Sequence, residues 1–141
     1  MKEVVSTSAD ETAELGRSYA ADLQPGDVVA LIGELGSGKT RFVAGICRGL
    51  GVPGQVASPT FTLINEYPAP FGAVAHIDLY RIDSPSELVE LGLEEYFSGR
   101  YVCLIEWAEK VEEMLPPGFR VVRIEHGEHE DERLFSFQES G

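Results

Sequence analysis

The sequence predicts one α/β domain in which a mixed, mainly parallel sheet lies between two layers of helices, with antiparallel strands added at its edges. Its 141 residues are enough for a single domain with a sizeable core. Two continuous apolar runs, 28–32 and 101–105, are typical of strands buried on both faces. Stretches of helical periodicity alternate with such runs, which indicates helices packed on both faces of a sheet. We therefore interpret residues 1–141 as one domain.

The N-terminal segment predicts a short strand followed by an amphipathic helix. Val4 and Val5 suggest the strand. Ser8 and Glu11 have the spacing of a capping box, in which two side chains satisfy backbone amides at the start of a helix. Apolar residues then recur every four positions, at Leu15, Tyr19 and Leu23. A turn over 24–27 ends the expected helix.

Residues 33–40 read GELGSGKT and satisfy the pattern G-x-x-x-x-G-K-[ST]. They follow the strand-like run 28–32 and precede a helical stretch that stops at Gly51. Backbone amides of such a loop and the helix N-terminus form a cradle for a pyrophosphate. Lys39 can reach the β and γ oxygens, and the Thr40 hydroxyl can ligate Mg²⁺. The glycines that allow this close approach are Gly33, Gly36 and Gly38. The pattern predicts a P-loop NTPase-like fold that binds a nucleotide; an ordinary glycine-rich turn is the alternative.

An exposed loop and a hairpin are expected next. The small residues of 51–58 are typical of a loop. The runs 60–67 and 73–80 are rich in β-branched, aromatic and apolar residues and predict two strands. The turn between them, 68–72, is too short for a crossover and favours an antiparallel pair.

The C-terminal half predicts further helices and strands. Ser84 and Glu87 repeat the capping-box spacing, with a proline at the first helical position. The expected elements are a short helix over 88–91, a helical turn over 93–97, a buried strand over 101–105, an acidic helix over 109–115, and strands over 119–125 and 134–137. The acidic segment 127–132 forms the turn of this closing hairpin.

Two carboxylates are candidates for chemistry. Glu106 comes directly after the buried strand 101–105, where it would lie beside Thr40 and serve Mg²⁺ like the acid of a Walker B motif. Glutamate is one methylene longer than the usual aspartate, so direct and water-mediated contact to Mg²⁺ both stay open. The alternative is that Glu106 is a charged residue at a strand end with no catalytic or binding role.

Asp78 is the second candidate. The period of two in a strand puts His76, Asp78 and Tyr80 on one face. We expect Asp78 to ligate Mg²⁺ or to orient a water molecule at the phosphate site; a carboxylate bonded to Arg81 is the alternative. We interpret His76 as structural.

Other residues carry weaker signals. Ser58 and Thr60 follow the exposed loop and form a candidate switch that senses Mg²⁺ or the γ-phosphate, together with Trp107. Trp107 is the only tryptophan and is otherwise expected in the core or at an interface. His126 and His129 are expected to be solvated.

The net charge, the two cysteines and the lengths of the apolar runs disfavour several functions and locations. The formal charge of −13, from 24 acidic and 11 basic residues, disfavours direct binding of nucleic acid or anionic lipid. An anionic nucleotide must then be held by local dipoles and Mg²⁺. Cys47 and Cys103 have no metal-like spacing and are expected to be buried free thiols in a reducing compartment. Without a signal peptide or an apolar run of membrane-spanning length, we expect a cytoplasmic location.

Five motifs occur together in order: GELGSGKT, SPTFTLINEY, HIDLYR, ELVELGLEEY and CLIEW. This series resembles the TsaE (YjeE) family, the small ATPases of bacterial tRNA threonylcarbamoyladenosine (t6A) biosynthesis. The likeness runs from about Ser8 to Trp107 and, more loosely, to the end of the chain.

The resemblance implies a P-loop α/β fold that binds ATP or ADP with Mg²⁺ and hydrolyses ATP slowly alone. It also implies association with the TsaB and TsaD proteins, and thus only an indirect connection to tRNA. The residues implied to hold the phosphates are Gly36, Ser37, Gly38, Lys39, Thr40 and Arg41. Thr40 and Glu106 are implied to serve Mg²⁺, and Asp78 to be the catalytic carboxylate. Asp10 and Arg133 match nucleotide-contacting positions.

Two other functions stay open at this point. A small P-loop kinase would use the same loop, although the chain has no arginine-rich lid segment. A nucleotide-gated binding module would hydrolyse ATP only incidentally. A GTPase is disfavoured because no N-K-x-D guanine signature follows the central strands.

Overall fold

A seven-stranded sheet forms the centre of the structure, a computed structural model that describes residues 2–33, 38–54 and 64–139. The strand order is β1-β7-β6-β2-β5-β4-β3. The strands are β1 (Lys2–Ser6), β2 (Val28–Gly33), β3 (Ile64–Ala69), β4 (Gly72–Asp78), β5 (Tyr101–Glu106), β6 (Arg120–His126) and β7 (Arg133–Glu139). The helices are α1 (Ala9–Ala20), α2 (Lys39–Gly49) and α3 (Pro85–Leu91), with 3₁₀ turns η1 (Leu93–Phe97), η2 (Ala108–Lys110) and η3 (Glu112–Met114).

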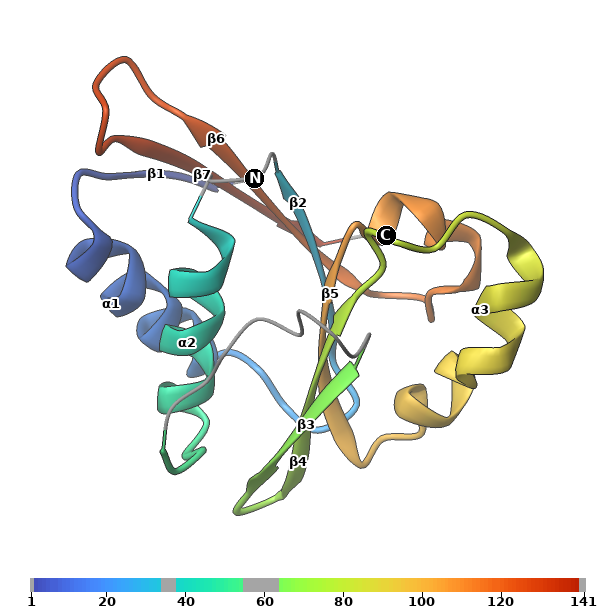
Figure 1. The fold of residues 1–141 in the computed structure, drawn as a ribbon. Helices are drawn as coiled ribbons and strands as arrows, with labels where there is room; N and C mark the ends of the chain where they lie inside the picture. Colours follow the sequence, from blue (N-terminus) through green and yellow to red (C-terminus); the bar gives the residue numbers. More distant parts are fainter. Residues whose placement is uncertain (1, 34–37, 55–63, 140–141) are drawn as a thin grey trace.

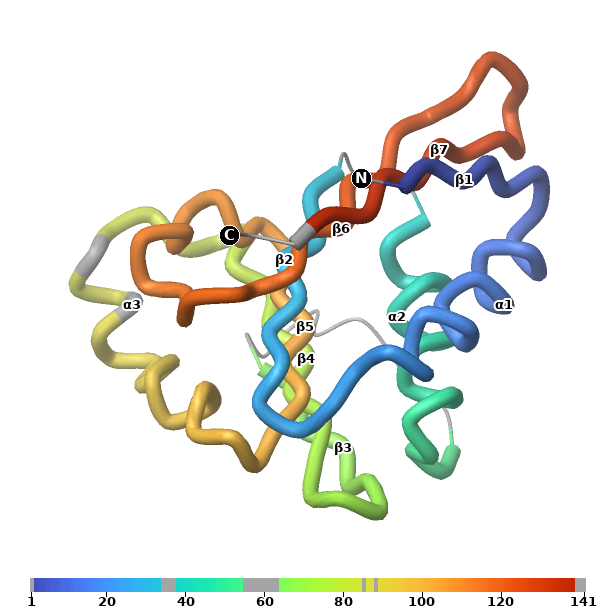
Figure 2. The backbone as a smooth tube through the Cα atoms, turned by 180° about the vertical axis from the view of Figure 1, so that it is seen from behind, coloured from blue at the N-terminus to red at the C-terminus, as the bar shows by residue number. Residues whose placement is uncertain are grey.

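The four central strands β6, β2, β5 and β4 are parallel, and β3, β7 and β1 add antiparallel pairs at the two edges. Helices α1 and α2 cover one face of the sheet, and α3 lies on the other (Figure 1). The same three layers are visible from behind (Figure 2). The predicted α/β/α fold with a mixed sheet is confirmed.

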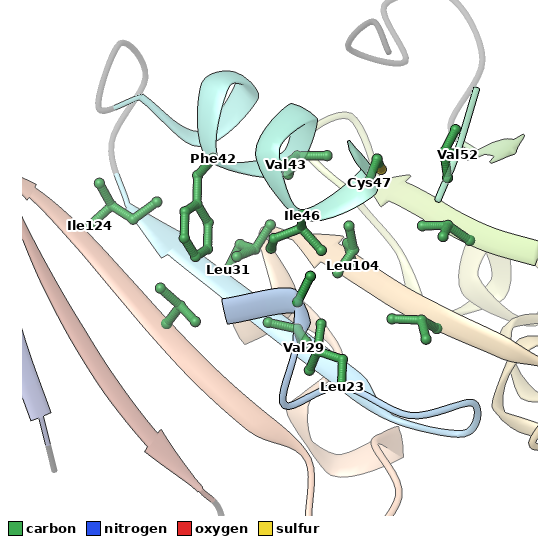
Figure 3. Packing of buried hydrophobic residues seen from close by; sticks show 14 of the residues in the cluster. Leu23, Val29, Leu31, Phe42, Val43, Ile46, Cys47, Val52, Leu104 and Ile124 are labelled. Carbon is green, nitrogen blue, oxygen red and sulfur yellow. The ribbon is translucent and has the colours of Figure 1, made fainter. Parts of the chain in front are cut away.

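Alternation along β2 builds a core on each face. Val29 and Leu31 pack with buried residues of α2, whereas Val28 and Ala30 belong to the cluster on the opposite face. Figure 3 shows Phe42, Val43 and Ile46 of α2 in the first of these clusters. Burying each large apolar side chain stabilises the fold by roughly 1.5–3 kcal/mol, which explains why these runs are continuously apolar.

Parallel pairing brings several strand ends to one edge of the sheet. Leu31 of β2 is paired with Glu106 of β5, and Glu106 is paired with Asp78 of β4. Gly33, where β2 ends, lies two residues beyond Leu31. The end of the phosphate-loop strand and both candidate carboxylates therefore share the carboxyl edge of the sheet.

Both predicted capping boxes have counterparts in the structure, the first in altered form. The Ser8 hydroxyl accepts a hydrogen bond from the Glu11 amide at 3.1 Å. The Glu11 carboxylate, however, accepts from the amide and hydroxyl of Thr7, one residue before the cap, and these bonds lower the pKa of Glu11. At α3, the Glu87 carboxylate accepts from the amides of Asp83 and Ser84.

Several predicted elements have different bounds, and three of the differences have a physical reason. The strand predicted to reach residue 80 ends at Asp78, because the Asp78 carboxylate accepts from the Tyr80 amide and forms a turn. The acidic helix predicted over 109–115 is two 3₁₀ turns, separated at Val111, whose φ of −131° is not helical. Strand β3 runs through Pro68, a residue predicted to lie in a turn; an edge strand tolerates proline because one row of its amides needs no partner.

Both cysteines are buried and free, as predicted. Burial raises the pKa of each thiol to about 12, so neither is a ready nucleophile at neutral pH. Within the described part of the chain, no helix combines the length and apolarity that crossing a membrane requires.

The close approach of α1 and α2 gives a testable prediction. A Cβ at Gly45 would overlap the backbone of Ala13, and one at Gly16 would overlap the Phe42 carbonyl oxygen. An alanine normally stabilises a helix interior by roughly 0.5–1 kcal/mol relative to glycine. Here we expect Gly45→Ala to lower the free energy of unfolding by about 1–3 kcal/mol, because the helices must separate. Urea denaturation measures the change.

The matched control is Ser18→Ala, at an exposed position of α1, with an expected change within about 0.5 kcal/mol. A Gly45→Ala protein more stable than the parent would contradict the close approach.

Candidate functional site

The phosphate loop leads from β2 into α2. Gly38 precedes the helix with φ of 100°, a left-handed conformation that glycine adopts without strain. Its carbonyl accepts the first helical hydrogen bond, from Phe42. The amides of the first helical turn have no earlier carbonyl within the helix and carry the positive end of the helix dipole. Gly36 and Ser37, predicted to hold phosphates, lie outside the described residues.

Lys39 is buried at this helix start, with only 6% of its surface exposed. Its Nζ donates to the Gly33 carbonyl at 2.7 Å and lies 3.8 Å from Oε1 of Glu106. The same ammonium is 4.9 Å from the centre of the Trp107 ring. The lysine of the predicted loop is therefore directly beside the predicted Mg²⁺ acid, and its ammonium faces groups that phosphate oxygens can replace.

Glu106 ends β5 and is 5% exposed. Besides the Lys39 contact, its Oε2 lies 2.6 Å from Nε2 of His76, which is fully buried. The sequence interpretation treated His76 only as a structural residue and missed this contact. The signal that could have found it is the strand period, which places His76 on the same face as Asp78, one of the two candidate carboxylates.

Asp78 reaches the same edge from β4, directly paired with Glu106. Its Oδ1 accepts from the Tyr80 amide at 2.9 Å, a local bond other than the Arg81 contact considered as an alternative. Thr40 is exposed in the first turn of α2. The structure thus brings Asp78 and Glu106 together.

These residues fit Mg²⁺ bound together with a nucleotide. Hydroxyl and carboxylate oxygens are the donors that Mg²⁺ prefers, and Mg²⁺ commonly takes one or two protein carboxylates plus phosphate oxygens and water. Among the residues described, no group of three or more His, Cys, Asp or Glu side chains could hold a metal by itself. A cation here would need Thr40, Glu106 and phosphate oxygens together.

Trp107 has an unusual backbone. Its φ of 62° makes it, over the described ranges, the single non-glycine residue with a positive φ. Its ring contacts both the Lys39 ammonium and the Tyr80 ring, and the ring centres of Trp107 and Tyr80 are 5.1 Å apart. Lys110 is 6.0 Å from the same ring and donates to the carbonyls of Tyr80 and Ile82. Trp107 thus connects the loop lysine to the segment after β4.

The role of Trp107 as a switch stays a prediction. Ser58 and Thr60, the other members of that candidate switch, lie outside the described residues. His126 and His129 are exposed, as predicted.

A cavity of about 130 Å³ lies beside Gly38, where the N-termini of α1 and α2 meet the turn between β6 and β7. It is lined by Ser8, Ala9, Thr12, Gly38, Arg41, Asp131 and Arg133. The Arg133 guanidinium donates to the carbonyls of Glu130 and Glu132, which holds it at this place. Asp10 is exposed in the first turn of α1 and does not line the cavity. Two predicted nucleotide contacts, Arg41 and Arg133, are thus neighbours of the phosphate loop.

The parallel β2-β5-β4 core, the loop that joins β2 to α2 and the carboxylates at the sheet edge define a P-loop NTPase-like α/β domain. The sequence model of the family described as "Threonylcarbamoyl adenosine biosynthesis protein TsaE" matches residues 6–135. The chain belongs to the TsaE family.

Named relatives agree. The TsaE protein of Bacillus subtilis (strain 168) is 43% identical over 136 residues, which are 96% of this chain and 84% of that protein. The TsaE protein of Treponema pallidum (strain Nichols) is 42% identical over 112 residues, 79% and 82% of the two chains. The crystal structure of YdiB from Bacillus subtilis matches with a TM-score of 0.83 and 37% identity, covering 99% of this chain and 86% of that one.

Trp107 gives a direct test of this site. We expect Mg²⁺ and ATP together to change the fluorescence of this sole tryptophan, because the Lys39 ammonium should leave the ring to meet the phosphates. A fluorescence titration measures the change, and Trp107→Phe provides the tryptophan-free baseline. Unchanged emission while calorimetry detects nucleotide binding would show that Lys39 stays in place.

Proposed function

We propose that this protein binds Mg²⁺·ATP and hydrolyses it in support of t6A modification of tRNA, acting with the TsaB and TsaD proteins. One observation carries the proposal: the buried Lys39, at the start of α2, contacts Gly33 and lies beside Glu106. Membership of the TsaE family supplies the pathway.

In this proposal different residues of the site bind the phosphates, hold Mg²⁺ and orient the attacking water. Lys39 and the amides at the start of α2 bind the phosphates, and Thr40 and Glu106 would hold Mg²⁺. When bound, Mg²⁺ neutralises charge that develops on the β and γ phosphate oxygens. Asp78, paired with Glu106 on the neighbouring strand, would orient the attacking water or complete the cation's shell. Arg41 and Arg133 line the adjacent cavity, where two positive charges suit an anionic nucleotide.

The connection to tRNA runs through partners. At a formal charge of −13 the isolated chain repels the phosphate backbone of a nucleic acid at long range. A complex that contains TsaB and TsaD would supply the tRNA-binding surface, and ATP turnover would change the conformation of that complex.

A nucleotide-gated binding module is the second candidate, and the surroundings of Trp107 favour it. The ring contacts both the loop lysine and Tyr80, so movement of Lys39 toward a phosphate would reach the segment after β4. In that case the bound nucleotide sets the affinity for a partner, and hydrolysis is incidental.

The proposed activity is tested by measuring ATP hydrolysis with and without TsaB and TsaD. We expect the partners to raise the rate about tenfold or more, equivalent to roughly 1.4 kcal/mol of the activation barrier. If TsaB and TsaD do not raise the rate and the protein transfers phosphate to a metabolite, the protein is a small P-loop kinase and the proposal is wrong.

Asp78→Asn separates binding from turnover. We expect the variant to keep its affinity for ATP and to hydrolyse ATP about 10²–10⁴-fold more slowly. The reason is that a neutral amide cannot accept a proton from the attacking water as a carboxylate can. Calorimetry and a phosphate-release assay measure the two quantities. Asp83→Asn is the matched control, at an exposed position between β4 and α3. Lost ATP affinity in Asp78→Asn would make Asp78 a ligand or structural group.

A further inference from the structure

His76 and Glu106 form a buried contact that the proposed mechanism does not use. Nε2 of His76 lies 2.6 Å from Oε2 of Glu106, and the two side chains are 0% and 7% exposed. They come from neighbouring parallel strands, where His76 is paired with Leu104, two residues before Glu106. Both project toward the α2 side, since Ala75, Ile77 and Ile105 belong to the opposite cluster.

The contact uses one carboxylate oxygen and leaves the other for the site. Oε2 of Glu106 faces His76, whereas Oε1 lies 3.8 Å from the Lys39 ammonium. A carboxylate with one oxygen held by a hydrogen bond has little freedom to rotate. Glutamate has one more rotatable bond than aspartate, so without such a contact it would lose more conformational freedom on binding a cation.

The polar side chain is costly at this position. Nδ1 of His76 is buried and has no hydrogen-bond partner among the residues that the structure describes. An unsatisfied buried polar atom destabilises a fold by roughly 1–3 kcal/mol, so an apolar residue would serve packing alone better. A role in holding the Glu106 side chain would account for a histidine at this buried position.

We propose that His76 is a positioning residue: its Nε2–H holds Oε2 of Glu106, so that Oε1 is directed to the Mg²⁺ of a bound nucleotide. The inference rests on the proposed function and deepens it. In this arrangement His76 contacts the metal ligand Glu106 and not the cation. Mutation of a residue that contacts a metal ligand typically lowers metal affinity about 10–100-fold.

The test compares His76→Asn with His76→Gln. A glutamine amide can take the place of Nε2, whereas an asparagine amide takes the place of Nδ1 and is too short to reach Glu106. We expect His76→Asn to raise the Mg²⁺ concentration for half-maximal ATP hydrolysis about tenfold or more. Nucleotide affinity in EDTA should be unchanged, and His76→Gln should restore most of the Mg²⁺ response. His129→Asn, at an exposed histidine, is the control.

Several outcomes would overturn the inference. Equal losses in both His76 variants, or an equal loss of affinity in EDTA, would make the residue merely structural. A Glu106→Gln background in which His76→Asn still changes the Mg²⁺ response would remove Glu106 as the intermediary. If the wild-type protein shows no Mg²⁺-dependent nucleotide binding, the proposed function fails as well; if it does and His76→Asn leaves it unchanged, only the His76 inference fails.

A measurement on the wild-type protein tests the same inference even if the His76 variants do not fold. Imidazole ¹⁵N NMR of the wild-type chain should find a proton on Nε2 of His76, as donation to Glu106 requires. An Nε2 without a proton would overturn the inference.

Discussion

Parallel pairing of β2, β5 and β4 is the constraint on which the site depends. The register aligns Leu31, Glu106 and Asp78 across three strands, so the phosphate loop and two carboxylates share one edge. A slip of one residue in β5 would turn Glu106 to the opposite face and bring Ile105 toward Lys39. Both faces of β5 are buried, so such a slip would mismatch the packing of its residues against the core clusters on the two faces. Packing energy thus secures the geometry of a polar site.

Charge is arranged differently inside and outside this protein. The surface carries most of the acidic excess, whereas Lys39 and Glu106 are both nearly buried and lie 3.8 Å apart. Burying either charge alone would be expensive, and removing one partner of a buried pair typically costs roughly 3–5 kcal/mol. The carbonyl of Gly33 and the imidazole of His76 complete the arrangement. A nucleotide phosphate would take the place of the Gly33 carbonyl and of Glu106 as partners of the Lys39 ammonium, while the contact of His76 with Glu106 is kept.

Neighbouring residues at the end of β5 have different surroundings. Glu106 contacts Lys39 and His76, and Trp107, with its left-handed backbone, brings its ring against Lys39 and Tyr80. A non-glycine residue in this conformation costs of order 1–2 kcal/mol, and such residues concentrate at functional sites. On the other side of the loop, the β6–β7 turn brings Arg133 to Arg41 beside Gly38. Segments far apart in the chain therefore meet around the first turn of α2.

Features that depend on local signals can be predicted from the sequence alone. The phosphate-loop pattern, the two doubly buried strands, the start of the first helix at Ser8 and the strand-end position of Glu106 follow from spacing and apolar runs within a few residues. Three features follow from tertiary contacts instead: the contact of His76 with Glu106, 30 residues away, the pairing of Asp78 with Glu106, and the position of Arg133 beside the cavity at Gly38. The end of β4 at Asp78 and the two short 3₁₀ turns over 108–114 are likewise seen only in the structure. The physical reason is that strand register and the packing of distant segments depend on contacts that no local periodicity encodes.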